Sequence, residues 1–220
     1  MQQTTDHAEA IAWTRDVAGT PNVGQIWVPQ RGFIKAVRKL GSVSLTRQDG
    51  NIFGMVIGPE PLVDPSWQRV ALPRNLPASR TEGLIPLSEW DVYTASTALA
   101  PTTVASEPVY ELDEIQSFLT LHAPDSGTHP DSDEAELWFG MREGERLIAV
   151  ATIARWESGA HMLSSVAVHT DHRGRGLGRQ LARDALFIGR HNDIGHVSLA
   201  VRHSNAAAIA AYRRAGYACI

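Results

Sequence analysis

The segment His172-Arg173-Gly174-Arg175-Gly176-Leu177-Gly178 decides how the chain around it folds. Residues 161–169, just before it, are mostly apolar and include two β-branched side chains, which is typical of a β-strand. The residues after it carry apolar side chains at helical spacing, at Leu177, Leu181, Ala185 and Ile188. The sequence therefore predicts a glycine-rich loop that joins a strand to the start of a helix.

Such a loop suits an anion. The first turn of a helix has main-chain N–H groups without helical partners, and it is the positive end of the helix dipole. Glycines allow tight turns and let a phosphate approach the main chain without a Cβ in the way. Arg173, Arg175 and Arg179 add positive charge. The predicted ligand is a dianion, most simply a pyrophosphate.

Other glycine-rich loops fit the sequence less well. The dinucleotide-binding fingerprint needs an acidic residue roughly 20 positions further on. His196 and Val197 stand there instead. The nucleoside-triphosphate loop needs Gly-Lys-Ser/Thr, which is absent from the sequence. A structural turn with merely solvated arginines is the remaining alternative.

A second stretch narrows the interpretation. Residues 197–202 alternate as a strand, and Asn205 can cap the helix predicted over 206–216. Gly216 ends that helix, and Tyr217 begins another strand. Arg-x-x-Gly-x-Gly at 173–178, followed by Asn205, Ala208, Tyr212 and Gly216-Tyr217, resembles the GNAT acyltransferase superfamily. The resemblance is clear over about 134–220 and weak over 88–133.

The resemblance implies acetyl-CoA as the acyl donor and assigns several roles. The pyrophosphate would lie on the loop formed by Arg173, Gly174, Arg175, Gly176, Leu177, Gly178 and Arg179. The main chain of Val166, Ala167 and Val168 would pair with the pantetheine amides, which requires this strand to separate from its neighbour. Asn205 would bond the pantetheine arm or only cap its helix. Tyr212 would be the general acid that protonates the departing thiolate, with packing as its alternative role.

The general base is not identified by the resemblance. Many relatives carry a glutamate on the strand before the loop, where this chain has Met162-Leu-Ser-Ser-Val. His161, Glu136 and His169 are the candidates, each able to act directly or through water. His122, His129, Asp131 and Asp133 follow no ligand spacing, so no metal site is predicted.

The predicted fold is mixed α/β, with a GNAT-type sheet flanked by helices. We expect an N-terminal lobe of unknown function over 1–87 and the acetyltransferase domain over 88–220. Within the lobe, we expect a helix from His7 to Val17, a helical stretch within 25–40 and a hairpin of strands 43–46 and 52–57. Residues 48–56 and 142–150 share a turn and the apolar run after it. A degenerate GNAT-like half is therefore one alternative for the lobe, and a general likeness between hairpins is the other.

Composition limits the partners. The 220 residues carry a formal net charge of −4, which argues against nucleic acid and suits a cationic amine. The acceptor is therefore expected to be a small amine or a peptide amine. A single cysteine, Cys219, allows no intrachain disulfide and fits a reducing cytoplasm. The apolar runs are too short for a membrane span, so no membrane association is expected. An acyl-CoA-binding sensor or scaffold without turnover is the alternative function.

The last predicted strand, at 217–220, is short and leaves an apolar sheet edge to be covered. We expect the N-terminal lobe, with its hairpin, to cover it. A partner subunit in a homodimer and a chain end trimmed from the natural protein are the alternatives.

Overall fold

The structure is a computed structural model, and it describes residues 1–18, 32–49, 51–60, 63–73, 76–77, 79, 81–156 and 158–220. The chain divides into two compact units. The first comprises Met1–Ser88 with Glu157–Gly159, and the second comprises Glu89–Trp156 with Ala160–Ile220. The functions predicted for the two parts of the chain stay predictions.

The first unit is a five-stranded sheet in the order β1-β2-β3-β4-β5, with one helix packed on it. Its elements are β1 (Gln2–Thr4), α1 (His7–Ala18), β2 (Phe33–Lys39), β3 (Ser42–Asp49), β4 (Asn51–Ile57) and β5 (Arg69–Ala71). Trp13 of α1 packs in a core with Val43 and Leu45 of β3. The helix from His7 and the β3–β4 hairpin are confirmed.

The helical stretch predicted within 25–40 is wrong in its described part. Residues 33–39 form β2, which pairs with β1 on one side and β3 on the other. The spacing of Ile34, Val37 and Leu40 fits a helix, but Ala36 is fully buried at the centre of the strand. Pairing and burial against two neighbours therefore override the local pattern. Residues 25–31 lie outside the described residues.

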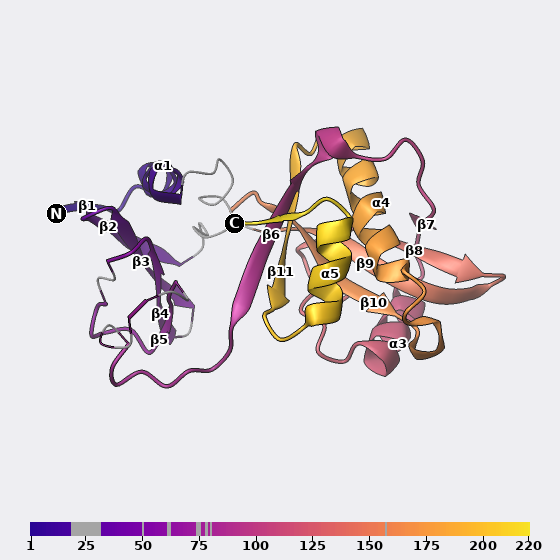
Figure 1. The fold of residues 1–220 in the computed structure, drawn as a ribbon, viewed down its shortest axis with the longest axis horizontal. Helices are drawn as coiled ribbons and strands as arrows, with labels where there is room; N and C mark the ends of the chain where they lie inside the picture. The colour runs from indigo at the N-terminus through magenta and orange to yellow at the C-terminus, as the bar shows by residue number, and fades with distance from the viewer. Residues whose placement is uncertain are drawn as a thin grey trace. The chain divides into compact units, whose positions relative to one another are not determined.

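The second unit holds a seven-stranded sheet in the order β12-β6-β11-β10-β9-β8-β7 (Figure 1). Only β10 and β11 run parallel, so the sheet is mixed, as predicted. The strands are β6 (Trp90–Ser96), β7 (Glu107–Pro108), β8 (Ala135–Glu143), β9 (Arg146–Arg155), β10 (His161–Val168), β11 (His196–Arg202) and β12 (Ala218–Cys219). The helices are α3 (Leu112–His122), α4 (Leu177–His191) and α5 (Ala206–Arg214). Two short 3-10 turns complete it, η2 (Thr97–Leu99) and η3 (Thr170–His172).

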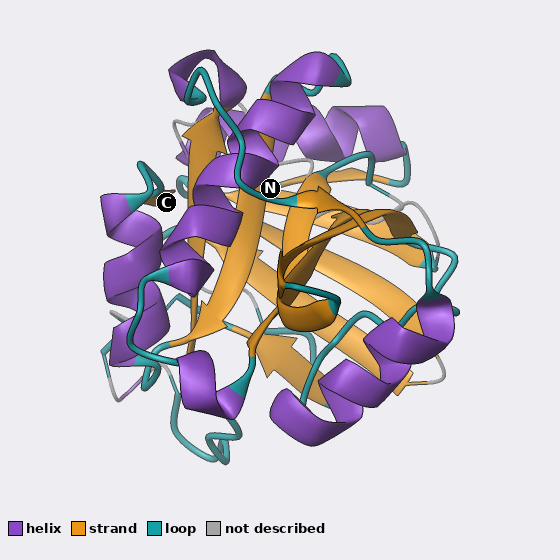
Figure 2. Ribbon diagram, turned by 90° about the vertical axis from the view of Figure 1, so that its right-hand side faces the viewer, coloured by secondary structure: helices purple, strands orange, loops and turns teal. Residues whose placement is uncertain are grey.

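Helices cover both faces of this sheet (Figure 2). On one face, Leu181 and Ala185 of α4 and Tyr212 of α5 share a core with Leu163 and Leu199 of the strands. On the other face, α3 packs Ile115, Phe118 and Leu119 against Trp138 and Val150. The inner positions of β9 are all buried, as a strand covered on both faces requires. No helix of the described residues is long and apolar enough to cross a membrane.

The terminal strand β12 lies at one edge of the seven-stranded sheet. β12 pairs with β6, and β6 separates it from β11. The hairpin strands β3 and β4 pair within their own five-stranded sheet and do not extend the seven-stranded one. The hairpin therefore does not serve as the next strand beyond β12.

Candidate acyl-donor site

Strand β10 separates from β11 soon after it begins. The two strands pair only at Met162 with Ser198, although β10 continues to Val168. On its other side, β10 pairs with β9 up to Val168. Residues 163–168 therefore have one main-chain edge without a strand partner among the described residues, which we call the open edge of β10. This separation is the condition that the predicted pantetheine pairing of Val166, Ala167 and Val168 requires.

An irregularity in β10 accompanies this separation. The register with β9 shifts between Ser164 and Ala167, and Ser165 has a φ of 50°, in the left-handed region that a non-glycine residue rarely adopts. Thr128, from the loop after α3, holds this conformation. Its main-chain N–H donates to Ser165 Oγ at 3.2 Å, and Ser165 Oγ donates to Thr128 O at 2.6 Å. The two hydroxyls of Thr128 and Ser164 lie 2.8 Å apart.

The glycine-rich segment presents a run of free N–H groups. Helix α4 begins after Gly176, and its first helical hydrogen bond is from Gln180 N to Gly176 O. Within the described residues, no hydrogen bond uses the main-chain N–H groups of residues 174–179, which we call the amide loop. These groups lie at the positive end of the α4 dipole. The arrangement suits a phosphate-bearing ligand.

Gly176 and Gly178 of the amide loop differ in whether the fold itself requires a glycine. Gly176 has a φ of 83°, so a side chain there would strain the backbone. Gly178 lies in the helix, and a Cβ added there would meet no atom within 4 Å. The protein itself therefore does not require glycine at position 178, whereas a ligand on the amide loop would.

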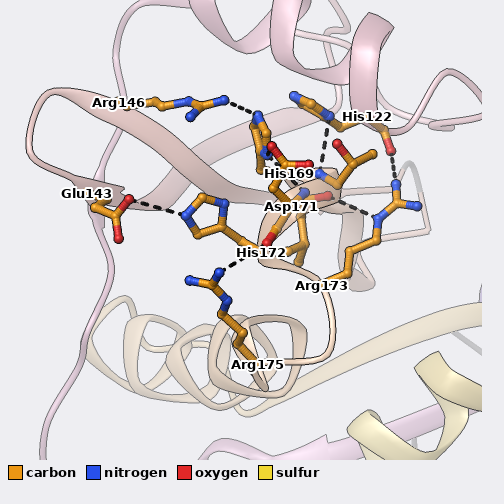
Figure 3. Close-up of polar contacts among 10 residues, drawn as sticks. His122, Glu143, Arg146, His169, Asp171, His172, Arg173 and Arg175 are labelled. Carbon is orange, nitrogen blue, oxygen red and sulfur yellow. Dashed lines mark hydrogen bonds and ion pairs between the residues drawn. The ribbon is translucent and has the colours of Figure 1, made fainter.

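Arg173 uses its main-chain N–H and its guanidinium in hydrogen bonds within the protein. Its N–H donates to Thr170 O, its Nε donates to Val168 O at 3.3 Å, and its Nη2 donates to His122 O at 2.7 Å (Figure 3). The side chain thus caps the last carbonyl of α3 and fixes the loop to that helix. Arg175 donates to Asp171 O, and Arg179 is exposed. Arg173 thus joins the loop to the end of α3, and Arg175 and Arg179 carry positive charge beside the amide loop.

Tyr212, on α5, is buried in the core that α5 shares with β10. It is 9% exposed and belongs to the same core as Leu163, against which Val166 and Val168 of β10 also pack. Burial raises the pKa of Tyr212 to about 12, so the phenol is protonated at neutral pH. No hydrogen bond joins its hydroxyl to any residue that the structure describes. The hydroxyl can therefore donate to a ligand.

Asn205 caps α5, as one of its two predicted roles requires. Its side-chain oxygen accepts a hydrogen bond from Ala208 N at 3.1 Å. The two amide protons of the exposed Asn205 side chain are not used in that bond.

The structure brings together two of the three candidate bases. His161 Nε2 lies 3.4 Å from Glu136 Oε2, and Glu136 also lies 3.9 Å from Arg155. Desolvation lowers the pKa of His161, Arg155 lowers it further, and Glu136 raises it. His161 is therefore neutral and able to accept a proton at neutral pH. His169 lies at the other end of β10, beyond the strand.

Sequence reasoning did not foresee a cluster of imidazoles beside the loop. Figure 3 shows the three rings close together. The ring centroids of His122 and His169 are 4.1 Å apart, and those of His169 and His172 are 5.3 Å apart. Arg146, at the start of β9, contacts His169 Nε2, and Glu143 lies 3.3 Å from His172 Nε2. These residues come from α3, the β8–β9 turn and the loop after β10. The histidines are visible in the sequence, but only the fold brings them together. Neither this cluster nor any other group of three or more His, Cys, Asp or Glu among the described residues is arranged so that it could hold a metal ion.

The site thus combines the open edge of β10 with the unpaired main-chain N–H groups at the start of α4. The model of the acetyltransferase (GNAT) family matches residues 96–217, more than half of the chain. The chain belongs to this family.

Comparison with individual proteins agrees with this assignment. Streptothricin acetyltransferase of Streptomyces lavendulae is 45% identical over 56 residues, which are 26% of this chain and 30% of that protein. The chain thus matches less than a third of the length of this relative. The GCN5-related N-acetyltransferase of Sphaerobacter thermophilus has a similar fold, with a TM-score of 0.60 and 14% identity over 97% of this chain and 88% of that one. That of Kribbella flavida has a TM-score of 0.52 and 17% identity over 94% and 91%.

Gly178→Glu tests the amide loop. The fold should tolerate this substitution, because a Cβ has free space and a carboxylate is favourable near a helix start. Acetyl-CoA binding should weaken by about 100-fold or more, because charge-assisted hydrogen bonds of about 1.5–3 kcal/mol each are lost. Calorimetric titration measures this affinity. Gly195→Glu is the control, since a Cβ at Gly195 also meets no atom within 4 Å. Equal affinity in both variants would refute the pyrophosphate assignment.

Proposed function

We propose that the protein transfers the acetyl group of acetyl-CoA to the primary amine of a small molecule or a peptide, by direct attack within a ternary complex. The observation that carries this proposal is the run of unpaired N–H groups at residues 174–179 beside the open edge of β10. Together they offer donors to a pyrophosphate and an unpaired strand edge to pantetheine amides. The family assignment supports the same chemistry.

In this proposal the amine nitrogen attacks the thioester carbonyl, and the carbon–sulfur bond then breaks. The amine loses one proton to a base, and the departing thiolate gains one from an acid. The products are an amide and free coenzyme A. The protein forms no covalent intermediate, so its residues only have to position the thioester and move these two protons.

Tyr212 is the proposed acid. Its buried phenol keeps its proton at neutral pH, and its hydroxyl has no partner among the described side chains and main-chain groups. The same desolvation that raises its pKa would also raise the pKa of a thiolate leaving nearby. The pKa values of the phenol and of the leaving thiol are therefore both raised, so proton transfer from the phenol to the thiolate stays feasible.

His161 is the proposed base, with Glu136 beside it. It adjoins Met162, the one residue of β10 that pairs with β11, and therefore lies where the open edge begins. Its lowered pKa keeps the ring neutral, and the carboxylate of Glu136 would stabilise the imidazolium that forms when the ring takes a proton. The arrangement supplies from two strands what many relatives have as a glutamate.

We propose a cationic acceptor. The loop between α3 and β8 carries exposed acidic side chains, and Thr128 fixes this loop to β10 at Ser164 and Ser165. The negative net charge of the protein also favours the approach of a cationic acceptor. A cytoplasmic location is part of the proposal, because it suits both a single cysteine and the intracellular donor.

A panel of primary amines with acetyl-CoA, followed by release of free thiol, tests the function. The partial similarity to streptothricin acetyltransferase makes streptothricin the first acceptor to include. Thiol release that depends on the amine supports the proposal. Acetyl-CoA binding without release for any amine, including peptide amines, would favour the sensor or scaffold.

Tyr212→Phe should lower kcat by roughly 10²–10⁴-fold, because it removes the acidic proton and keeps the packing. Acetyl-CoA affinity should change by only a few-fold. Tyr217→Phe is the matched control, since the buried Tyr217 hydroxyl donates to Ala182 O at 3.2 Å within the core. It should lower the free energy of unfolding by about 1 kcal/mol and leave kcat nearly unchanged. An unaltered kcat in Tyr212→Phe would exclude the phenol as the acid.

The pH profile of kcat/KM tests the base. Because neutral His161 is the active form and its pKa is lowered, activity should be lost only as the pH falls below about 6.5. His161→Gln should remove this acidic limb and most of the activity. Glu136→Gln should move the limb to lower pH, because Glu136 raises the pKa of His161. If Glu136→Gln is inactive and His161→Gln is active, Glu136 is the base and this assignment is wrong.

A further inference from the structure

His169 is surrounded by more donors than it can accept from. The main-chain N–H of Asp171 donates to its Nδ1 at 3.2 Å, and the Arg146 guanidinium contacts its Nε2. A guanidinium has only donors, and a neutral imidazole has one accepting nitrogen. In either neutral tautomer, the ring N–H therefore faces another donor, which is Asp171 N–H at Nδ1 or the Arg146 guanidinium at Nε2.

Arg146 has no better partner nearby. Its side chain is exposed, and no acidic side chain of the described residues forms a salt bridge with it. The Asp171 carboxylate lies 3.9 Å from Nδ1 of His169, the nitrogen opposite the one that Arg146 contacts. The guanidinium therefore points into the histidine cluster without a counter-charge.

His122 adds another donor. Its Nδ1 faces Thr170 N at 3.5 Å, so the neutral ring carries its proton on Nε2. Figure 3 shows this second nitrogen on the same side of the cluster as Nε2 of His169 and the guanidinium of Arg146. The ring is half-buried, and its centroid lies 4.1 Å from that of the His169 ring, with the two planes tilted by 47°. Desolvation lowers the pKa of His122, the nearby Arg173 and Arg146 lower it further, and Asp171 raises it.

We infer that Arg146, His122 and His169 form a binding site for a phosphate-class oxyanion. Such an anion would accept from the guanidinium and from the Nε2–H groups of both rings, so each donor would gain an acceptor. A tetrahedral dianion has enough acceptor sites for donors arriving from three directions. The anion could be free in solution, or it could be the 3′-phosphate of acetyl-CoA. The second source rests on the proposed function.

Sulfate is the probe, because it stays dianionic over the whole working pH range. Imidazole Cε1–Hε1 resonances of the full chain are followed by NMR at constant ionic strength, with chloride as the balancing anion. The His122 and His169 resonances should move saturably with sulfate. Arg146→Gln should weaken this binding about tenfold, because one charge-assisted hydrogen bond is lost.

Two controls separate this site from other effects. Arg155→Gln removes the arginine at the opposite end of β9 and should leave sulfate binding unchanged. Gly178→Glu repels anions from the amide loop and should still allow the His122 and His169 shifts. Resonances that do not respond to sulfate, or that respond with equal affinity in Arg146→Gln, would overturn the inference.

The source of the anion follows from a second titration. Acetyl-CoA and its analogue without the 3′-phosphate are compared in the wild-type protein and in Arg146→Gln. If the 3′-phosphate fills the site, Arg146→Gln weakens acetyl-CoA about tenfold and leaves the analogue unaffected. If a free anion fills it, both donors bind both proteins alike, while the sulfate result stands. Failure of acetyl-CoA to bind the wild-type protein would count against the proposed function and leave the sulfate result independent.

Discussion

The separation of β10 from β11 after a single pairing is the constraint on which the rest of the site depends. A parallel pair that continued to Val168 would use the main-chain groups that a pantetheine arm needs. The register shift in β10 and the left-handed Ser165 accompany the separation, and Thr128 stabilises this conformation through its main chain and its hydroxyl. The loop that contains Thr128, distant in sequence from the glycine-rich segment, thus helps to shape β10, the strand that leads into that segment.

The loop that follows has two sides with different electrostatics. Toward α4, residues 174–179 offer main-chain N–H groups at the positive end of a helix. Toward α3, side chains of His122, His169 and Arg146 gather, and Arg173 links the loop to the end of α3. Positive charge and unused donors on both sides suit a ligand that carries more than one phosphate group. Tyr212 lies outside the loop on α5, and His161 and Glu136 lie near the starts of β10 and β8. These are the residues assigned to the proposed proton transfers.

The sequence predicts an element correctly where the spacing of its apolar residues matches both its secondary structure and the faces that it buries. The strong helical repeat of α4, the alternation of β11 and the buried run of β9 all correspond to observed elements. Residues 33–39 were predicted incorrectly because pairing with β1 and β3 outweighs their helical spacing. The His161–Glu136 contact and the histidine cluster depend on strands and turns distant in sequence, so no local pattern could reveal them. The commitment of Arg173 to Val168 O and His122 O likewise depends on where α3 ends.

In the proposed complex, the main-chain N–H groups of residues 174–179 bind the pyrophosphate of acetyl-CoA. Amide hydrogen exchange resolved to single residues tests it most directly. Without ligand, these amides should exchange fast, because no hydrogen bond within the described chain protects them. At saturating acetyl-CoA they should become protected, together with amides along residues 163–168. If acetyl-CoA binds and residues 174–179 still exchange at the rate of the free protein, the account is contradicted.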